Sequence, residues 1–186
     1  MEGAPKRAAQ IGAIVAIVGA LSFGAIVQRE QHPSLAAAPL DVPAPRELLD
    51  LIDYAELEAT ATMVAPAGID AVVVLAKDHL QVELWTRPPT PEAPATLLSS
   101  TRYAADGKVF FFKGGIKSLS GELDGSATLV TEASVTISGN VRRSGDERVL
   151  AVIAKGDIRS AHDGSEPLEI DATLLSTAGR VDDRLR

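Results

Sequence analysis

The sequence predicts an all-β fold: an antiparallel β-sandwich or open barrel of about eight or nine strands, preceded by a single N-terminal transmembrane helix and a short capping helix. Three observations support this prediction. Polar and apolar residues alternate through much of the chain after residue 55, which is typical of strands with one buried and one wet face. Asp-Gly pairs, which favour tight turns, separate these runs. Near the amino end lies a long apolar stretch without any charge.

The strands are predicted from runs in which the period of two is nearly unbroken. A Pro-rich stretch, residues 87–94, interrupts the series and indicates a loop, because proline donates no backbone hydrogen bond to a sheet. The alternating runs are residues 56–63, 79–86, 123–141 and 168–174, and the turn pairs begin at Asp106, Asp124 and Asp163.

The apolar stretch is residues 11–27, which follow Lys6 and Arg7. Its length is at the short end of what spans a bilayer, and the same pattern fits a cleaved secretory signal. We favour a retained anchor, which would pack on neighbouring helices through small residues. The positive-inside rule then predicts a cytoplasmic N-terminus and a periplasmic or extracellular C-terminal domain. The proposed helix-packing residues are Gly12, Gly19 and Gly24.

The predicted domain order follows from these assignments. A proline after the tether is suited to the first turn of a short helix from residue 46 to about residue 55, which would cap the sheet. The segments are a cytoplasmic N-terminus (1–10), the anchor (11–27), a Pro/Ala-rich tether (28–45), an exported β-domain that includes the short helix (46–178) and a polar tail (179–186).

Composition and residue spacing argue against an enzyme. The formal net charge of −7 disfavours nucleic-acid binding, which needs a basic face. The absence of cysteine removes thiolate chemistry, and the three histidines lack the spacing of a metal site. A cluster of Asp157, Ser160, His162 and Asp163 is better explained as turn chemistry than as a catalytic triad. We therefore predict no catalytic residues, no metal site and no cofactor.

Apolar side chains on faces expected to be wet indicate a partner interface. Phe111 must point away from Phe110 and Phe112, and the strand 71–75 has no polar side. Either the short helix covers them or a partner does. The candidate partner interface is Phe111, Trp85, Val72 and Val74, and the candidate contacts for an anionic partner are Lys113, Lys117, Arg142 and Arg159.

A short glycine motif recurs in the second half of the chain. KGGIKS (113–118) is similar to KGDIRS (155–160), and Gly121 and Gly139 sit in related contexts. Over residues 114–180 the chain resembles the bactofilin family, which implies a β-helical fold that polymerises. The alternative is that each glycine marks a bulge or bend in an antiparallel strand. The overall layout also resembles the bitopic lipopolysaccharide-export component, and the last strands resemble YceI-like barrels that hold isoprenoids.

Together these features predict a non-enzymatic, membrane-anchored accessory or scaffold subunit that docks a periplasmic β-domain onto a membrane protein complex. Its expected partners are other subunits of the complex and, through the N-terminal helix, membrane lipids. The first alternative is a periplasmic carrier that holds an apolar or lipid ligand between its sheets, which needs an unfilled apolar cavity of about 300 Å³ or more. The second alternative is a self-polymerising β-solenoid.

Overall fold

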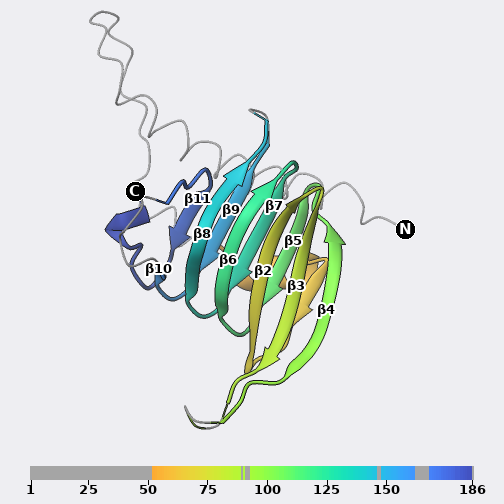
Figure 1. Cartoon of the computed structure of the whole chain (residues 1–186), viewed down its shortest axis with the longest axis vertical. Coiled ribbons are helices and arrows are strands. Elements are labelled where there is room, and N and C mark those ends of the chain that lie inside the picture. The colour runs from red at the N-terminus through yellow and green to blue at the C-terminus, as the bar shows by residue number, and fades with distance from the viewer. Residues whose placement is uncertain (1–51, 89, 91–92, 146–147, 162–167, 186) are drawn as a thin grey trace, which may run out of the picture. The chain divides into compact units, whose positions relative to one another are not determined.

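The computed structural model describes residues 52–88, 90, 93–145, 148–161 and 168–185. Residues Asp53–Arg186 form one compact unit. Within the described residues, eleven strands make two sheets, with one α-helix and one short 3-10 helix beside them (Figure 1). The β-rich character predicted from the alternating runs is therefore correct.

The two sheets differ in size and in strand direction. Sheet A is entirely parallel and has the order β1 (Met63–Ala65), β5 (Lys108–Phe112), β7 (Ala127–Thr131), β9 (Leu150–Ala154) and β11 (Thr173–Ser176). Sheet B is mixed and has the order β10 (Ile158–Ser160), β8 (Val135–Arg143), β6 (Ile116–Leu123), β2 (Ile69–Lys77), β3 (His79–Thr86) and β4 (Leu97–Ala104).

The predicted antiparallel sandwich or barrel is wrong, because the chain coils between the sheets instead of reversing within one. From β5 to β10 successive strands alternate between sheet A and sheet B. Each time the chain returns to a sheet, the new strand runs in the same direction as the previous strand of that sheet. Lys108 of β5 therefore pairs with Ala127 of β7, and Ala127 with Leu150 of β9, in parallel register. This part of the molecule is a two-sheet β-solenoid. Alternation predicts strands, but it carries no information on their direction.

The predicted turns have a different role from the one expected. Asp106-Gly107 and Asp124-Gly125 lead from sheet B to sheet A and do not close hairpins. Antiparallel pairing occurs instead between β2 and β3, around Asp78, and between β3 and β4. Lys77, just before that reversal, adopts a left-handed φ of 46°. Asp163 lies outside the described residues.

The recurring glycine motif marks equivalent corners of the coil. KGGIKS connects β5 to β6, and KGDIRS connects β9 to β10. A Cβ atom on Gly114 would lie 1.7 Å from the carbonyl oxygen of Ile69 in the preceding coil, so the backbones are too close there for a side chain. A Cβ on Gly156 would similarly lie 2.6 Å from the Ser134 hydroxyl. These glycines allow adjacent coils to stack closely.

The run 56–63, predicted as a strand, forms a helix over most of its length. Helix α3 (Tyr54–Thr60) begins at Asp53, whose carboxylate accepts hydrogen bonds from the amides of Ala55 and Glu56 at 2.9 and 3.1 Å. This N-cap satisfies donors that have no partner within the helix. The helix packs on β5, with Leu57 2% exposed. Helix α3 overlaps only the end of the predicted capping helix, of which residues 46–51 lie outside the described residues.

The core lies between the sheets and is built from small and medium aliphatic side chains with two phenylalanines. Phe110 and Phe112 of β5 are fully buried in it, together with residues such as Val73 and Leu119 of sheet B. At one end of the solenoid, the β3–β4 hairpin extends sheet B beyond β2, and Tyr103 of β4 packs edge-on against Phe110 at 5.7 Å. At the other end, Leu185 and Val181 pack against the same core.

The predicted membrane topology is also overturned. No helix in the described part of the chain has the length and apolar character needed to cross a membrane. The proposed anchor, residues 11–27, lies outside the described residues, as do Gly12, Gly19 and Gly24. The described residues therefore give no support to the single-pass assignment, the cytoplasmic N-terminus or the periplasmic or extracellular domain.

Candidate functional site

The His, Asp and Glu side chains of the described residues do not gather into a metal-binding cluster. No group of three or more His, Asp or Glu side chains in this part of the chain could hold a metal ion. His79 contacts the adjacent Asp78 at 2.9 Å, in an exposed position. Asp157 is paired with Arg159 and accepts the amide of Arg180, while His162 and Asp163 of the rejected triad lie outside the described residues. That the chain is not an enzyme stays a prediction.

An apolar patch lies on the outer face of sheet B, across β2, β3 and β4. Residues 71, 73 and 75 of β2 point into the core, so Val72 and Val74 point outward. Trp85 of β3 pairs with Asp70 on one side and, across a register shift, with Leu97 of β4 on the other, which places all three on this same face. The indole Nε1 of Trp85 donates to Glu83, two residues earlier on that face, at 3.2 Å. We call Val72, Val74, Trp85 and Leu97 the apolar patch; Val74 is 39% and Leu97 44% exposed.

Beside the patch, a buried carboxylate holds two cations. Asp70 is only 1% exposed, and its two oxygens accept from different strands. Arg87, at the end of β3, approaches Oδ1 through Nη2 at 2.5 Å and Oδ2 through Nε at 3.3 Å. Lys117 of β6 places Nζ 2.8 Å from Oδ2. The two cationic side chains are 53% and 51% exposed, so both remain in contact with solvent.

The two cations keep Asp70 ionised. Burial alone would raise the pKa of the Asp70 carboxyl, but hydrogen bonds from Arg87 and Lys117 outweigh this effect and lower the pKa below its usual value. The same hydrogen bond raises the pKa of the Arg87 guanidinium. The cluster therefore carries two positive charges against one negative charge at neutral pH.

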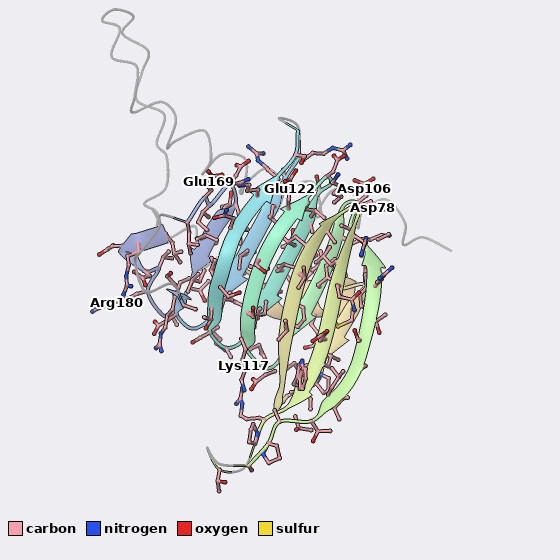
Figure 2. The ribbon with its side chains drawn as sticks, in the orientation of Figure 1. Asp78, Asp106, Lys117, Glu122, Glu169 and Arg180 are labelled. Atoms are coloured by element: carbon pink, nitrogen blue, oxygen red, sulfur yellow. The ribbon has the colours of Figure 1, made fainter. Side chains whose placement is uncertain are left out.

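A hollow of about 440 Å³ opens next to this cluster. Figure 2 shows Lys117 at the opposite end of sheet B from Asp78 and Glu122. Two hydroxyl side chains, Ser134 and Thr136, lie in the wall of the hollow and add hydrogen-bonding capacity. The full lining is Asp70, Arg87, Gly115, Ile116, Lys117, Ala133, Ser134 and Thr136.

No protein family, curated protein or solved structure matches the chain.

Of the four apolar residues predicted as an interface, three lie on the same face of one sheet. Val72, Val74 and Trp85 share the outer face of sheet B, as described above. Phe111 does not join them: it points outward from sheet A, is 0% exposed and packs edge-on against Tyr54 of α3, with ring centroids 6.5 Å apart. Its burial beneath the helix removes Phe111 from the candidate surface.

The four predicted cationic contacts are spread over the molecule. Only Lys117 lines the hollow. Lys113 pairs with Glu58 of α3 at 2.7 Å, and Arg159 pairs with Asp157 at 2.5 Å. Arg142 pairs with Glu169. Each of these three is matched by a carboxylate at its own position, so they form no common anion-binding surface.

Sequence reasoning missed Asp70, Arg87 and Leu97. The available signal was Asp70, a charge at the start of an otherwise apolar strand, since a buried charge needs a partner. Its two partners could not be identified from the sequence because they come from other strands. The sequence places Arg87 at the start of the Pro-rich loop, and its amide donates to the carbonyl of Gly68, the residue before β2, at 3.3 Å.

Proposed function

We propose that this chain is a non-enzymatic scaffold or accessory subunit that binds a protein partner through the outer face of sheet B. The observation that carries the proposal is the apolar patch: Val74 and Leu97 are exposed and share the outer face of sheet B with Val72 and Trp85, although Val72 pairs with Glu83 and Val74 with Gln81 on β3. Tryptophan and arginine are enriched among the residues that dominate binding energy at protein interfaces. Here Arg87 borders the patch through Asp70, the strand neighbour of Trp85.

The packing of the interior supports a scaffold more than a carrier. A carrier for an apolar molecule needs an apolar cavity between its sheets. The side chains that face each other across the sheets, such as Val73, Leu119 and Leu129, are 0% exposed and belong to one continuous core. The hollow of about 440 Å³ lies instead beside the Asp70 cluster, and its lining mixes charged and hydroxyl side chains with Gly115, Ile116 and Ala133.

The two ends of the solenoid differ in how open they are to the stacking that the self-polymerising alternative needs. At one end, β4 is the terminal strand of sheet B and is almost wholly exposed. At the other end, Val181 forms a bridge with Ile158 of β10, and Ile170 one with Val141 of β8. The second end therefore favours a scaffold over a polymer.

The proposal is tested by site-specific crosslinking followed by reconstitution. A photoreactive residue is placed at Val74, and at Val64 of β1 as a matched control, because the two valines are 39% and 41% exposed on different sheets. The protein crosslinked at Val74 in the producing cells is identified by mass spectrometry and purified, and its affinity is measured. Val74→Asp should weaken binding at least about tenfold, since it places a charge in an apolar contact. Val64→Asp should change the affinity less than about twofold. Equal crosslinking at both positions, or equal loss of affinity in both variants, would refute this docking surface.

A further inference from the structure

The cluster at Asp70 differs from the other ion pairs in how its charge is balanced. Lys113, Arg142 and Arg159 each pair with one carboxylate. Asp70 instead forms ion pairs with both Arg87 and Lys117, so the cluster has one more positive charge than negative charges. Because these two cations approach the same carboxylate within 2.5 and 2.8 Å, they repel each other at short range. A second anion that bridges them would relieve this repulsion.

The hydrogen-bond donors of the cluster are only partly used. Arg87 directs Nε and Nη2 toward Asp70, so the donors on Nη1 are available for a planar carboxylate. Lys117 uses one of its donors on Asp70 and is 51% exposed. Asp70 holds both side chains in place before any ligand arrives, which reduces the entropy lost on binding.

The surroundings of the hollow indicate which kind of anion would bind. The net charge of the chain is −7, which opposes binding of a polyanion such as nucleic acid. One excess positive charge matches a single carboxylate. Trp85, which pairs with Asp70, and Leu97, which pairs with Trp85, would contact apolar groups next to that carboxylate. An acidic side chain within an otherwise apolar segment of a protein has both features.

We propose that the hollow between Arg87 and Lys117 receives an Asp or Glu side chain of the protein partner, while residues flanking it pack on Trp85 and Leu97. This inference rests on the proposed function and specifies the chemistry of the partner. Asp70 is a positioning residue: it orients the two cations and does not itself contact the partner carboxylate.

The test uses peptides, and the single tryptophan of the chain provides a second readout. Two libraries of blocked heptapeptides are passed over the immobilised full chain; one has Glu at the centre and the other Gln, with identical mixtures of Val, Leu and Thr at the flanks. Retained peptides are sequenced, resynthesised and titrated while Trp85 fluorescence is recorded. The Glu peptides should bind at least about tenfold more tightly than their Gln counterparts, as expected for a charge-assisted hydrogen bond.

The preference for Glu should disappear in Lys117→Gln and persist in Lys113→Gln, a matched control whose lysine pairs with Glu58 outside the hollow. Lys117→Arg should restore it in large part. Equal retention of both libraries, or a preference that survives Lys117→Gln, would overturn the inference. Competition with inorganic phosphate forms a further arm. If phosphate changes the fluorescence of Trp85 while the Glu and Gln peptides bind equally, the hollow is a site for a free anion and the inference is wrong.

The two proposals can fail separately. If the purified partner loses affinity in Val74→Asp but binds Lys117→Gln as tightly as the wild type, the docking surface stands and the carboxylate contact does not. If neither variant weakens binding, the docking surface itself is in the wrong place.

Discussion

The ring of Tyr54 meets the ring of Phe111 edge-on, at 83° between the planes, while its hydroxyl lies 3.0 Å from the hydroxyl of Thr177. One side chain of α3 thereby contacts β5 and also a residue just beyond β11. The ammonium of Lys155 lies 5.9 Å from the centre of the same ring. Tyr54 thus connects the helix to both early and late coils of the solenoid.

Removing this contact should lower the free energy of unfolding. Tyr54→Ala loses the aromatic packing on Phe111 and should cost about 2–4 kcal/mol. Tyr54→Phe keeps the packing and loses only the hydroxyl contact with Thr177, so it should cost about 1 kcal/mol. Urea unfolding followed by circular dichroism measures both values. Equal stability of Tyr54→Ala and the wild type would mean that α3 does not pack on sheet A in solution.

Asp70 should make stability depend on pH in the acid range. Its pKa is lowered in the folded state, so the stabilisation is fully present above the unfolded-state value of about 4 and is lost as the pH falls through the folded-state value. Asp70→Asn should cost about 1–3 kcal/mol at pH 7, because it removes the charge that Arg87 and Lys117 contact. Below about pH 4 the difference between the variant and the wild type should shrink.

The control for this measurement is Asp106→Asn. Asp106 forms an exposed pair with Arg148 at 3.4 Å, and an exposed pair of this kind contributes less than about 1 kcal/mol. Unfolding free energies are measured by urea titration from pH 2 to 7. A difference between Asp70→Asn and the wild type that stays constant over this range would show that ionisation of Asp70 does not stabilise the fold.

The positions of many strands could be predicted from the alternation, whereas for their connections the sequence offered only the recurring glycine motif, which fits a β-solenoid and also fits bulges in antiparallel strands. The alternation in 79–86 predicts β3 correctly, because a half-buried strand needs an apolar face. Whether the chain reverses within a sheet or crosses to the other sheet depends on the conformation of the turn between two strands. Asp124-Gly125 suits both outcomes, and a close approach such as that of Gly114 to Ile69 involves residues far apart in the sequence. The segment 56–63 fails for a different reason: the Asp53 cap and helix-favouring Ala and Glu residues outweigh its alternation.

Only one part of the candidate site could be predicted from the sequence, namely which side chains of a strand share a face, because that follows from the two-residue period of a strand. Val72 and Val74 share an outer face because they are two residues apart on one strand. The prediction for Phe111 correctly gives its direction, opposite to Phe110, but not the helix that covers it. The cluster around Asp70 combines side chains from β2, β6 and the end of β3, so it appears only when the register of three strands is known.

Gly114 should be among the residues least tolerant of substitution. A Cβ atom there would lie 1.7 Å from a backbone oxygen of Ile69, and backbone in a stacked coil cannot move aside as a side chain can. Gly114→Ala should therefore cost about 3 kcal/mol or more, or prevent folding. Gly125→Ala is the matched control, because its nearest contacts would be side-chain carbons at 3.9 Å. Similar thermal unfolding midpoints for the two variants would contradict the close stacking of β2 and β6 at this corner.

The parallel pairing of β6 with β8 can be tested by an engineered disulfide. The hydroxyl oxygens of Ser118 and Ser138 are 2.5 Å apart on the outer face of sheet B, next to the paired residues Leu119 and Ile137. The chain contains no cysteine, so a Ser118→Cys/Ser138→Cys variant has a single pair of thiols. Because a disulfide forms only between residues whose Cβ atoms are already close, oxidation should be rapid and should leave the fold unchanged.

The control pair is Ser118→Cys/Ser176→Cys, which joins β6 of sheet B to β11 of sheet A. Free thiols are counted by alkylation and mass spectrometry before and after mild oxidation. The coiled topology requires a bridge between residues 118 and 138 and none between 118 and 176. A chain that reversed at Asp124, as an antiparallel sandwich does, would instead bring β6 against the strand that directly follows it, β7, and the 118–138 pair would stay reduced.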